Sequence, residues 1–597
     1  MKFNLIFNKL SLMNIKKISK AKYLTPVLIL LVIVTNCFGP KLTNNFPLNN
    51  FSLNKKLISK GKHITSKGEL KALFVFVMFK DDTLTKSNAW KFNTKKLPDW
   101  CTKIVNNTTE KIFPEANLTH YFYEMSRGNF LLYGDVYPKL VIPDSAESKY
   151  KSIKEVNYEI LKKLDDEIDY SEYDNWKRTK DGKYINQPDS VVDMVFIVYR
   201  NFSNRLFFNQ GWTGIAQLYL TKPIKTDDGV TIKNGVLSSG SGVVQRGGKH
   251  GFTYTKYILA HEFAHFLFGS GHIKFASNLS LLIASLWNES RGMHSWERAK
   301  LGWINFKDVQ LNKNADYILD DYITTGDALR IPLSKNEWFL IENHQRISPN
   351  DWAQDRGIFI FHINGAKRFP PSITNECADG NWNFKIDTKN KKLVKTIPNK
   401  RGKNETNFFN RKNNTNYACY EELYGDNSGW GDQFDAYDLT YNNIFSPVSN
   451  PPSSNYAKKK FAIYIKKKTG NKYKLGILFN DIYKNTPPSK PQITGLKNKK
   501  SNTPSLEWLP NEEPDLLKYA VYKTSGKKNK LLGYIKKDIW QLKFKLKKLN
   551  RNSENFIYLI AIDKTQKKSL PSNLISIKWN KLKNEWQYKL LEKNSIR

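Results

Sequence analysis

The sequence predicts an α+β fold that is followed by an all-β C-terminal sandwich. Residues 71–79 and 193–199 are continuous apolar runs of strand length, which is typical of strands buried on both faces. The stretch 254–268 is long and apolar, which favours a buried helix. Strand-like pieces dominate residues 311–475, and period-two alternation dominates the chain after residue 485.

The first 36 residues are expected to be a lipoprotein-type signal peptide. Lysines without any acidic residue precede an apolar run at 24–35, which is too short to span a bilayer. The segment 33–37, Ile-Val-Thr-Asn-Cys, resembles a bacterial lipobox, which implies lipid attachment at Cys37. We therefore expect an exported protein, held at the cell surface or outer membrane by a lipid anchor. Asn36 replaces the usual small residue, so ordinary signal cleavage with secretion, or retention of the apolar segment as an anchor, remains the alternative.

The formal net charge of +40 raises the question of an anionic partner. Of the 95 basic residues, 80 are lysines and 15 are arginines, and they are spread along the whole chain. A groove built for phosphates would favour clustered arginine. We therefore expect no specific nucleic-acid partner, whereas binding to acidic surfaces or matrix remains a secondary expectation.

Three cysteines follow Cys37. Cys377 and Cys419 are candidates for a disulfide in an exported protein, where their bond would close a long loop rich in asparagine and lysine. Cys101 would then be left over.

The residues His261, Glu262 and His265 form an H-E-x-x-H motif inside the apolar helical stretch. Residues four apart lie on one face of a helix, so both imidazoles can reach one metal ion, and Glu262 leans toward the same site. Glu262 is then placed as the general base of a zinc-dependent hydrolase. The alternative is an amphipathic surface helix whose histidines are only solvated.

The third ligand is expected just beyond this helix. His265 is followed by Phe-Leu-Phe-Gly-Ser-Gly-His, one residue longer before the first glycine than the metzincin spacing H-x-x-G-x-x-H. Gly269 and Gly271 can adopt the positive φ that turns the chain back, so His272 is our preferred ligand. Glu289 is the rival, because a downstream glutamate completes another class of H-E-x-x-H enzymes, and an unidentified residue is a third option.

Six short blocks between residues 68 and 455 carry a family resemblance. They are Tyr-Phe-Tyr-Glu-Met-Ser-Arg-Gly at 121–128 with Gly-Asp-Val at 134–136, the segment 168–174 leading to 193–196, the H-E-x-x-H helix, Ser-Trp-Glu-Arg-Ala-Lys-Leu-Gly-Trp at 295–303, 337–343 and 357–364. In this order they resemble the immune-inhibitor-A type of secreted bacterial zinc metallopeptidase, within the metzincin clan. The resemblance implies a metzincin-like zinc peptidase domain at 68–310 with a β-rich extension at 311–484.

Two features depart from that family. Its calcium-binding loop usually runs D-x-D-G-D-G, whereas Asp174 and Asp181 are separated here by uncharged and basic residues, so calcium has little support. Metzincins also place a methionine turn beneath the zinc. The corresponding place holds residues 283–285, Ile-Ala-Ser, with Met293 nearby as a substitute.

The C-terminal region, 485–597, starts with a proline-rich stretch that marks a boundary. It resembles a fibronectin type III domain in its alternating strands and in Trp508 of the second strand, which implies a spacer or adhesive module. Residues 37–67, between Cys37 and the peptidase region, are polar and are expected to form a tether.

The expected function is that of a surface-anchored zinc endopeptidase acting on extracellular proteins or peptides. Tyr254 and His362 are candidates, by chemistry alone, for the group that stabilises the oxyanion. Two alternatives remain: a non-catalytic adhesin that keeps the peptidase scaffold, and a zinc amidase that acts on cell-wall peptides.

Overall fold

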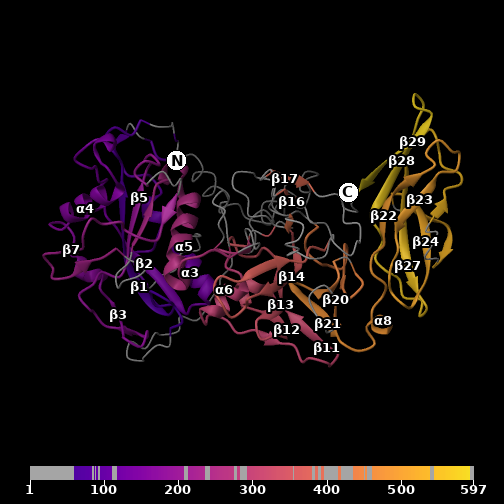
Figure 1. Ribbon diagram of the computed structural model, residues 1–597, viewed down its shortest axis with the longest axis horizontal. Helices are drawn as coiled ribbons and strands as arrows, with labels where there is room; N and C mark the ends of the chain where they lie inside the picture. Colours follow the sequence, from indigo (N-terminus) through magenta and orange to yellow (C-terminus); the bar gives the residue numbers. More distant parts are fainter. Residues whose placement is uncertain are drawn as a thin grey trace, which may run out of the picture. The chain divides into compact units, whose positions relative to one another are not determined.

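The structure is a computed structural model that describes residues 59–591 with internal gaps (Figure 1). Cys37 and the tether up to residue 58 lie outside the described residues. None of the described helices is both long and apolar enough to cross a membrane. The gaps are residues 84–86, 88, 92–93, 110–116, 208–212, 235–241, 274–278, 283–291, 352, 354, 379–383, 388–391, 396–414, 419–433, 450, 454–459, 527 and 538–542.

The N-terminal region is built on a five-stranded sheet of order β2-β1-β5-β9-β6. Neighbouring strands pair in parallel from β2 to β9, and β6 is antiparallel to β9 at the end of the sheet. Alternate residues of β1 enter two different cores, which explains why its sequence is apolar from Ala72 to Val77. The strands are β1 (Gly68–Val77), β2 (Phe130–Val136), β5 (Val195–Tyr199), β6 (Gly214–Ile215) and β9 (Gly242–Gln245).

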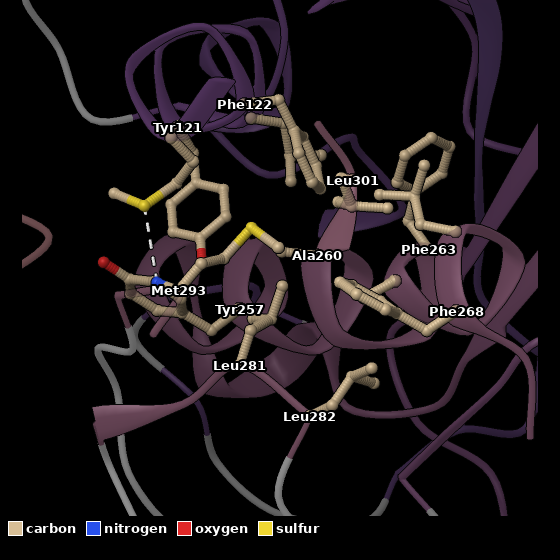
Figure 2. Packing of buried hydrophobic residues seen from close by; sticks show 14 of the residues in the cluster. Tyr121, Phe122, Tyr257, Ala260, Phe263, Phe268, Leu281, Leu282, Met293 and Leu301 are labelled. Carbon is tan, nitrogen blue, oxygen red and sulfur yellow. Dashed lines mark hydrogen bonds between the residues drawn. The ribbon is translucent and has the colours of Figure 1, made fainter. Parts of the chain in front are cut away.

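Helix α5 (Phe252–Phe268) packs in the core on one face of this sheet, together with α3 (Leu118–Ser126). Every α5 residue from Thr255 to Phe268 is buried, which is why apolar residues occur on all faces of the helix. Figure 2 shows aromatic residues of α3 facing α5, where the rings of Phe122 and Phe263 lie 5.0 Å apart. Helix α4 (Ile153–Lys163) supplies the core on the other face.

Two further sheets follow in the chain and enclose a third core. One has the order β10-β12-β13-β14-β15 and the other the order β11-β21-β20-β19. Phe359 and Phe361 of β14 belong to the core that contains α5, whereas Ile358 and Ile360 belong to the third core. The first of the two sheets therefore shares its core with the helix that carries the H-E-x-x-H motif. The strands are β10 (Lys307–Asp308), β11 (Ala315–Leu319), β12 (Ala328–Ser334), β13 (Glu337–His344), β14 (Gly357–Asn364), β15 (Ser372–Asn375), β19 (Ile444–Phe445), β20 (Ala462–Thr469) and β21 (Lys472–Leu478).

The C-terminal region consists of two antiparallel sheets around a separate core. One sheet has the order β22-β23-β26 and the other β25-β24-β27-β28-β29. Trp508 and Tyr519 meet in this core with ring centroids 5.3 Å apart. The strands are β22 (Gln492–Lys497), β23 (Ser505–Leu509), β24 (Leu516–Ser525), β25 (Lys528–Lys536), β26 (Lys543–Lys545), β27 (Asn555–Asp563), β28 (Leu574–Asn580) and β29 (Glu585–Leu591).

The chain as a whole is mostly β-sheet with few helices, which confirms the predicted fold class in part. The helices α6, α7 and α8 are short, with one or two turns each. The remaining elements are β3 (Trp176–Arg178), β4 (Tyr184–Asn186), β7 (Ile224–Lys225), β8 (Thr231–Ile232), β16 (Phe384–Asp387), β17 (Lys392–Lys395), β18 (Thr415–Ala418), α6 (Ser295–Lys300), α7 (Tyr322–Thr325), α8 (Ile482–Asn485), and 3-10 turns at Cys101–Lys103, Glu147–Lys149, Tyr170–Tyr173 and Gly248–His250.

A buried network of charged groups joins α6 to strand β13. Glu342 accepts a hydrogen bond from the backbone N–H of Ser295 at 2.8 Å and lies 3.1 Å from His344 Nε2. The other ring nitrogen, Nδ1 of His344, lies 2.9 Å from Asp351 Oδ1. Burial alone would lower the pKa of His344, but the two carboxylates outweigh it and raise this pKa to about 10.

We expect His344→Gln to lower the melting temperature most at pH 6 and progressively less toward pH 10. The folded-state pKa of His344 is raised, so its stabilisation is complete below the unfolded pKa of about 6.5 and disappears as the pH passes about 10. Near neutral pH the loss corresponds to about 3 kcal/mol, since a buried charge pair loses one partner. Thermal unfolding of both proteins across this pH range measures the difference.

His362→Gln is the matched control, because burial lowers the pKa of His362 despite its contact with Glu337. Its effect on the melting temperature should not shrink as the pH rises. A His344→Gln difference that is the same at pH 6 and pH 10 would show that His344 is uncharged in the fold.

Candidate metal centre

Helix α5 places His261 and His265 one turn apart on one face. The helix is bounded by two glycines with positive φ, Gly251 at 94° and Gly269 at 102°. Because glycine has no β-carbon, both residues can adopt this positive φ, which begins and ends the helix. The two imidazole ring centroids lie 5.0 Å apart.

His272 returns to the same place after the helix ends. Gly269 and Gly271 both have positive φ, as the tight turn requires. His272 Nε2 lies 3.2 Å from His261 Nε2, and the ring of His272 lies 5.1 Å from that of His265. One nitrogen from each of the three histidines lies within 4.8 Å of the other two.

This arrangement fits a tetrahedral zinc ion. Zinc binds imidazole nitrogens at about 2.0–2.1 Å, so two nitrogens on one tetrahedral ion are about 3.3 Å apart. The observed 3.2 Å between the nitrogens of His261 and His272 agrees with this spacing. Burial lowers the pKa of His265, which favours the neutral imidazole that a metal requires.

Backbone carbonyls orient two of the three rings. His261 Nδ1 lies 2.7 Å from the carbonyl oxygen of Leu281, and His265 Nδ1 lies 3.1 Å from that of Gly269. A carbonyl oxygen can only accept, so in each pair Nδ1 carries the proton and Nε2 keeps its lone pair. Both rings therefore present Nε2 as a metal ligand.

Glu262 lies beside β6, the antiparallel strand at the end of the first sheet. A β-carbon added to Gly214 would approach Glu262 Oε1 to 2.8 Å, so only glycine leaves room for this carboxylate. Burial raises the pKa of Glu262 to about 8. A divalent cation at the three histidines would act against this shift, because it favours the carboxylate form.

Glu297 is a supporting residue that the motif did not reveal. It is fully buried on α6 and its carboxylate accepts hydrogen bonds from Ser280 Oγ at 3.0 Å and from the backbone N–H groups of Leu281, Leu282 and His294 at 3.3, 3.1 and 2.7 Å. Burial raises its pKa to about 7. Because Leu281 provides the carbonyl that orients His261, Glu297 holds the segment on which this ligand depends. Glu297 lies in the 295–303 block of the family resemblance, but the resemblance assigns no role to this block.

The turn between β14 and β15 forms a wall beside the third histidine. The ring of Phe369 stacks on Phe268, the last residue of α5, at 5.6 Å. A β-carbon on Gly271 would lie 3.3 Å from Cδ of Pro370. The β-rich extension therefore contacts the loop that carries His272.

The other predicted site residues are placed as follows. Glu289, Cys419 and residues 283–285 lie outside the described residues, while Met293 is buried in the core with α5 (Figure 2). Cys377 is buried. Because Cys419 lies outside the described residues, the bond between the two cysteines stays a prediction. Cys101 is a buried free cysteine.

The two oxyanion candidates occupy different environments. The ring of Tyr254, on the first turn of α5, lies 4.8 Å from that of His250. His362 packs against Phe339, a residue of the third core, and its Nε2 lies 2.8 Å from Glu337. His362 is therefore on the face of β14 that points away from the core of α5, which argues against it as the oxyanion group.

Asp174 and Asp181, which take the place of the family's calcium-binding loop, already have partners. Asp174 accepts hydrogen bonds from the backbone N–H groups of Asp189 and Ser190, and Asp181 pairs with Lys183. Within the described ranges, the group of three potential metal ligands that come together is the histidine triad.

Comparisons with known proteins give no family. No protein family and no curated protein matches the sequence. A pectate lyase from Erwinia chrysanthemi in complex with tetragalacturonic acid is 16% identical over 15% of this chain and 28% of its own, with a TM-score of 0.13. A spore cortex lytic enzyme from Clostridium perfringens is 15% identical over 29% of this chain and 43% of its own, with a TM-score of 0.14. A fibronectin type III domain of a human protein is 24% identical over 15% of this chain and 84% of its own, with a TM-score of 0.13.

These likenesses are too weak to carry an argument about fold or function. The chain spans less than half the length of the lyase and of the lytic enzyme. The chemistry of the site therefore rests on the residues themselves.

We expect His272→Ala to strip zinc from the protein and Glu289→Ala to leave the zinc content near one per chain. Loss of one of three protein ligands leaves a two-histidine site that ordinary chelators can empty. Metal analysis of the two purified variants decides between the ligands. Zinc lost from the Glu289 variant but kept by the His272 variant would assign the site to the glutamate-ligand class.

We expect Glu297→Gln to weaken zinc binding by about 10–100-fold, as is typical when a group that supports a metal ligand is changed. Glutamine keeps only one acceptor oxygen, so it loses the hydrogen bonds to one carboxylate oxygen, either those from Leu281 and His294 N–H or that from Leu282 N–H. In either case the segment that carries the orienting carbonyl of Leu281 shifts. Competition with a chromophoric chelator measures the zinc affinity. Glu337→Gln is the control, since it removes a carboxylate from a different histidine, His362, and an equal loss there would mean a general effect on stability.

Proposed function

We propose that this protein is an exported, surface-anchored zinc endopeptidase that hydrolyses peptide bonds of extracellular proteins. The observation that carries the proposal is the convergence of His261, His265 and His272 on one point, with the buried carboxylate of Glu262 on the same helix. A zinc hydrolase needs three protein ligands and a general base. Here the ligands would be two imidazoles one helical turn apart and a third after a glycine turn, and the base would be the carboxylate that follows the first imidazole in the sequence.

The proposed fold is metzincin-like. Its support is a sheet of four parallel strands that ends in an antiparallel strand, β6, with the helix α5 packed on one face. The H-E-x-x-H motif lies on this helix, and Glu262 lies next to Gly214 of β6. The resemblance in the six sequence blocks agrees with this arrangement.

In the proposed mechanism, His261, His265 and His272 would hold the zinc ion. When bound, zinc supplies Lewis-acid chemistry, which polarises the scissile carbonyl and makes water a competent nucleophile at neutral pH. Glu262 accepts a proton from the attacking water and delivers it to the leaving amine nitrogen as the C–N bond breaks. Gly214 leaves room for this carboxylate beside β6.

An extended substrate has a place to pair in this arrangement. β6 is the last strand of the described sheet, and a peptide can add to the edge of a sheet through main-chain hydrogen bonds. Such a peptide would run past Glu262, because Gly214 of β6 is adjacent to that residue. Main-chain pairing would bind many sequences, which suits an endopeptidase.

The C-terminal region is proposed to be a fibronectin type III-like spacer or adhesive module. Its support is the arrangement of a three-stranded and a five-stranded antiparallel sheet around one core. None of the three histidines lies in this region, so we do not propose that it takes part in catalysis.

We expect Glu262→Gln to keep zinc and fold while it lowers peptide hydrolysis by about 10²–10⁴-fold, because the amide cannot accept the proton. The measurement is casein digestion beside zinc stoichiometry and thermal unfolding, with Glu172→Gln at an exposed position as the control.

Undiminished turnover in the Glu262 variant would remove this residue from the mechanism. A zinc-loaded wild-type protein that cleaves neither casein nor cell-wall peptides would favour the adhesin, and cleavage of the latter alone would favour the amidase.

A further inference from the structure

A cavity of about 690 Å³ lies between α6, strands β10, β12 and β13, and the β14–β15 turn. Its volume is in the range of about 300–1,000 Å³ that is typical of small-ligand sites. None of the three histidines lines it, so it is separate from the proposed metal centre. What it binds must follow from its own side chains.

The cavity is strongly basic. Lys60, Lys300 and Lys367 are exposed on its wall, and Arg330 is a fourth cation. No described carboxylate forms an ion pair with any of the three lysines, whereas Asp308, the acidic residue in the wall, is already paired with Arg330. The cavity therefore presents a surplus of positive charge that a bound anion would neutralise.

Arg330 is held rigidly against two aromatic rings. Its Nε and Nη2 donate to the two oxygens of Asp308 at 2.6 and 2.7 Å. Its guanidinium carbon lies 4.7 Å from the Trp338 ring and 5.3 Å from the Phe306 ring. No described acceptor contacts Nη1, so a pre-oriented donor remains for a ligand.

Aromatic surface accompanies the cations. Phe306 and Trp338 are half-buried, with ring centroids 5.9 Å apart and an interplanar angle of 72°. Trp296 also lines the cavity, where its indole N–H donates to the carbonyl of Ala366 at 2.8 Å. Flat apolar rings next to amines match a ligand that has apolar C–H faces and acidic substituents.

We infer that this cavity binds an acidic oligosaccharide, a sugar chain that carries sulfate or carboxylate groups. The rings of Phe306 and Trp338 offer apolar surface to the pyranose faces, and the lysine ammonium groups and Arg330 bind the anions. An acidic peptide would share the anions, but it would be recognised mainly through backbone groups. The cavity is lined by four cations, Asp308 and Asn305, and the backbone carbonyls of Ala366 and Lys367 already accept hydrogen bonds from Trp296 and Lys300.

Calorimetric titration of the purified protein at 0.15 M salt tests this assignment with three probes: a heparin tetrasaccharide, neutral cellotetraose and a hexaglutamate peptide. The pocket variant is Lys300→Glu/Lys367→Glu. Its matched control is Lys177→Glu/Lys180→Glu, which changes the net charge equally at two exposed lysines near β3. Phe306→Leu removes the aromatic ring but keeps an apolar side chain.

The heparin tetrasaccharide should bind at one site, and the pocket double variant should weaken it by about tenfold or more, because charge-assisted contacts are replaced by repulsion. The control pair should change the affinity less than about twofold, since separated surface charges are screened at this salt. Phe306→Leu should weaken the tetrasaccharide, and cellotetraose should bind at least about tenfold more weakly because it lacks the anions.

Three outcomes would overturn the inference. Equal weakening by both double variants would show diffuse attraction to a basic protein. Hexaglutamate that binds as tightly as the tetrasaccharide, with no effect of Phe306→Leu, would assign the cavity to acidic peptides. Absence of tetrasaccharide binding would reject the site, and none of these results depends on peptidase activity.

Discussion

The complete burial of α5 is the constraint on which the surrounding structure depends. An apolar helix that carries two histidines and a glutamate cannot remain at a surface, so it must be covered on every side. The first sheet and α3 cover part of it, and β14 contributes Phe359 and Phe361 to the same core. The β-rich extension is thus part of the enclosure of the proposed metal centre. Burial also explains the lowered pKa of His265 and the raised pKa of Glu262, since removal from water disfavours charge.

Short helix α6 connects these layers through two adjacent buried ionisable side chains. Glu297 gathers the backbone donors of the segment that orients His261. Arg298 donates from Nε to the carbonyl of Met125 at 2.8 Å and from Nη2 to that of Ile323 at 3.1 Å, so it ties α3 and α7 to α6. A buried charge is tolerated when such partners compensate its desolvation. The pair converts a six-residue helix, which has little stability of its own, into a fixed junction.

The sequence predicts those features that depend on local spacing. The four-residue interval of His261 and His265 places both on one helix face, and the glycines after the helix indicate the return of His272. The apolar run of β1 likewise follows from burial on both faces. Each of these patterns is contained within about twenty residues, so no knowledge of the tertiary fold was needed.

Features that depend on tertiary contacts could not be predicted in this way. The support that Glu297 gives to His261 crosses 36 residues through an intervening carbonyl, and a backbone carbonyl leaves no mark in a sequence. His362 had suitable chemistry, but the pleat of β14 directs it to the third core. The net charge was visible at once, whereas its concentration around Arg330 arises only when α6, β12 and the β14–β15 turn meet.

That turn also connects the two sites that we propose. Lys367 lines the basic cavity, and two and three residues later Phe369 and Pro370 lie against Phe268 and Gly271 beside the third histidine. A ligand that fixes Lys367 would therefore restrict the wall of the proposed metal centre. Coupling of this kind is reciprocal in binding free energy: whatever an oligosaccharide does to metal affinity, the metal does to oligosaccharide affinity. Such coupling is physically reasonable because only two or three residues of one turn separate Lys367 from Phe369 and Pro370.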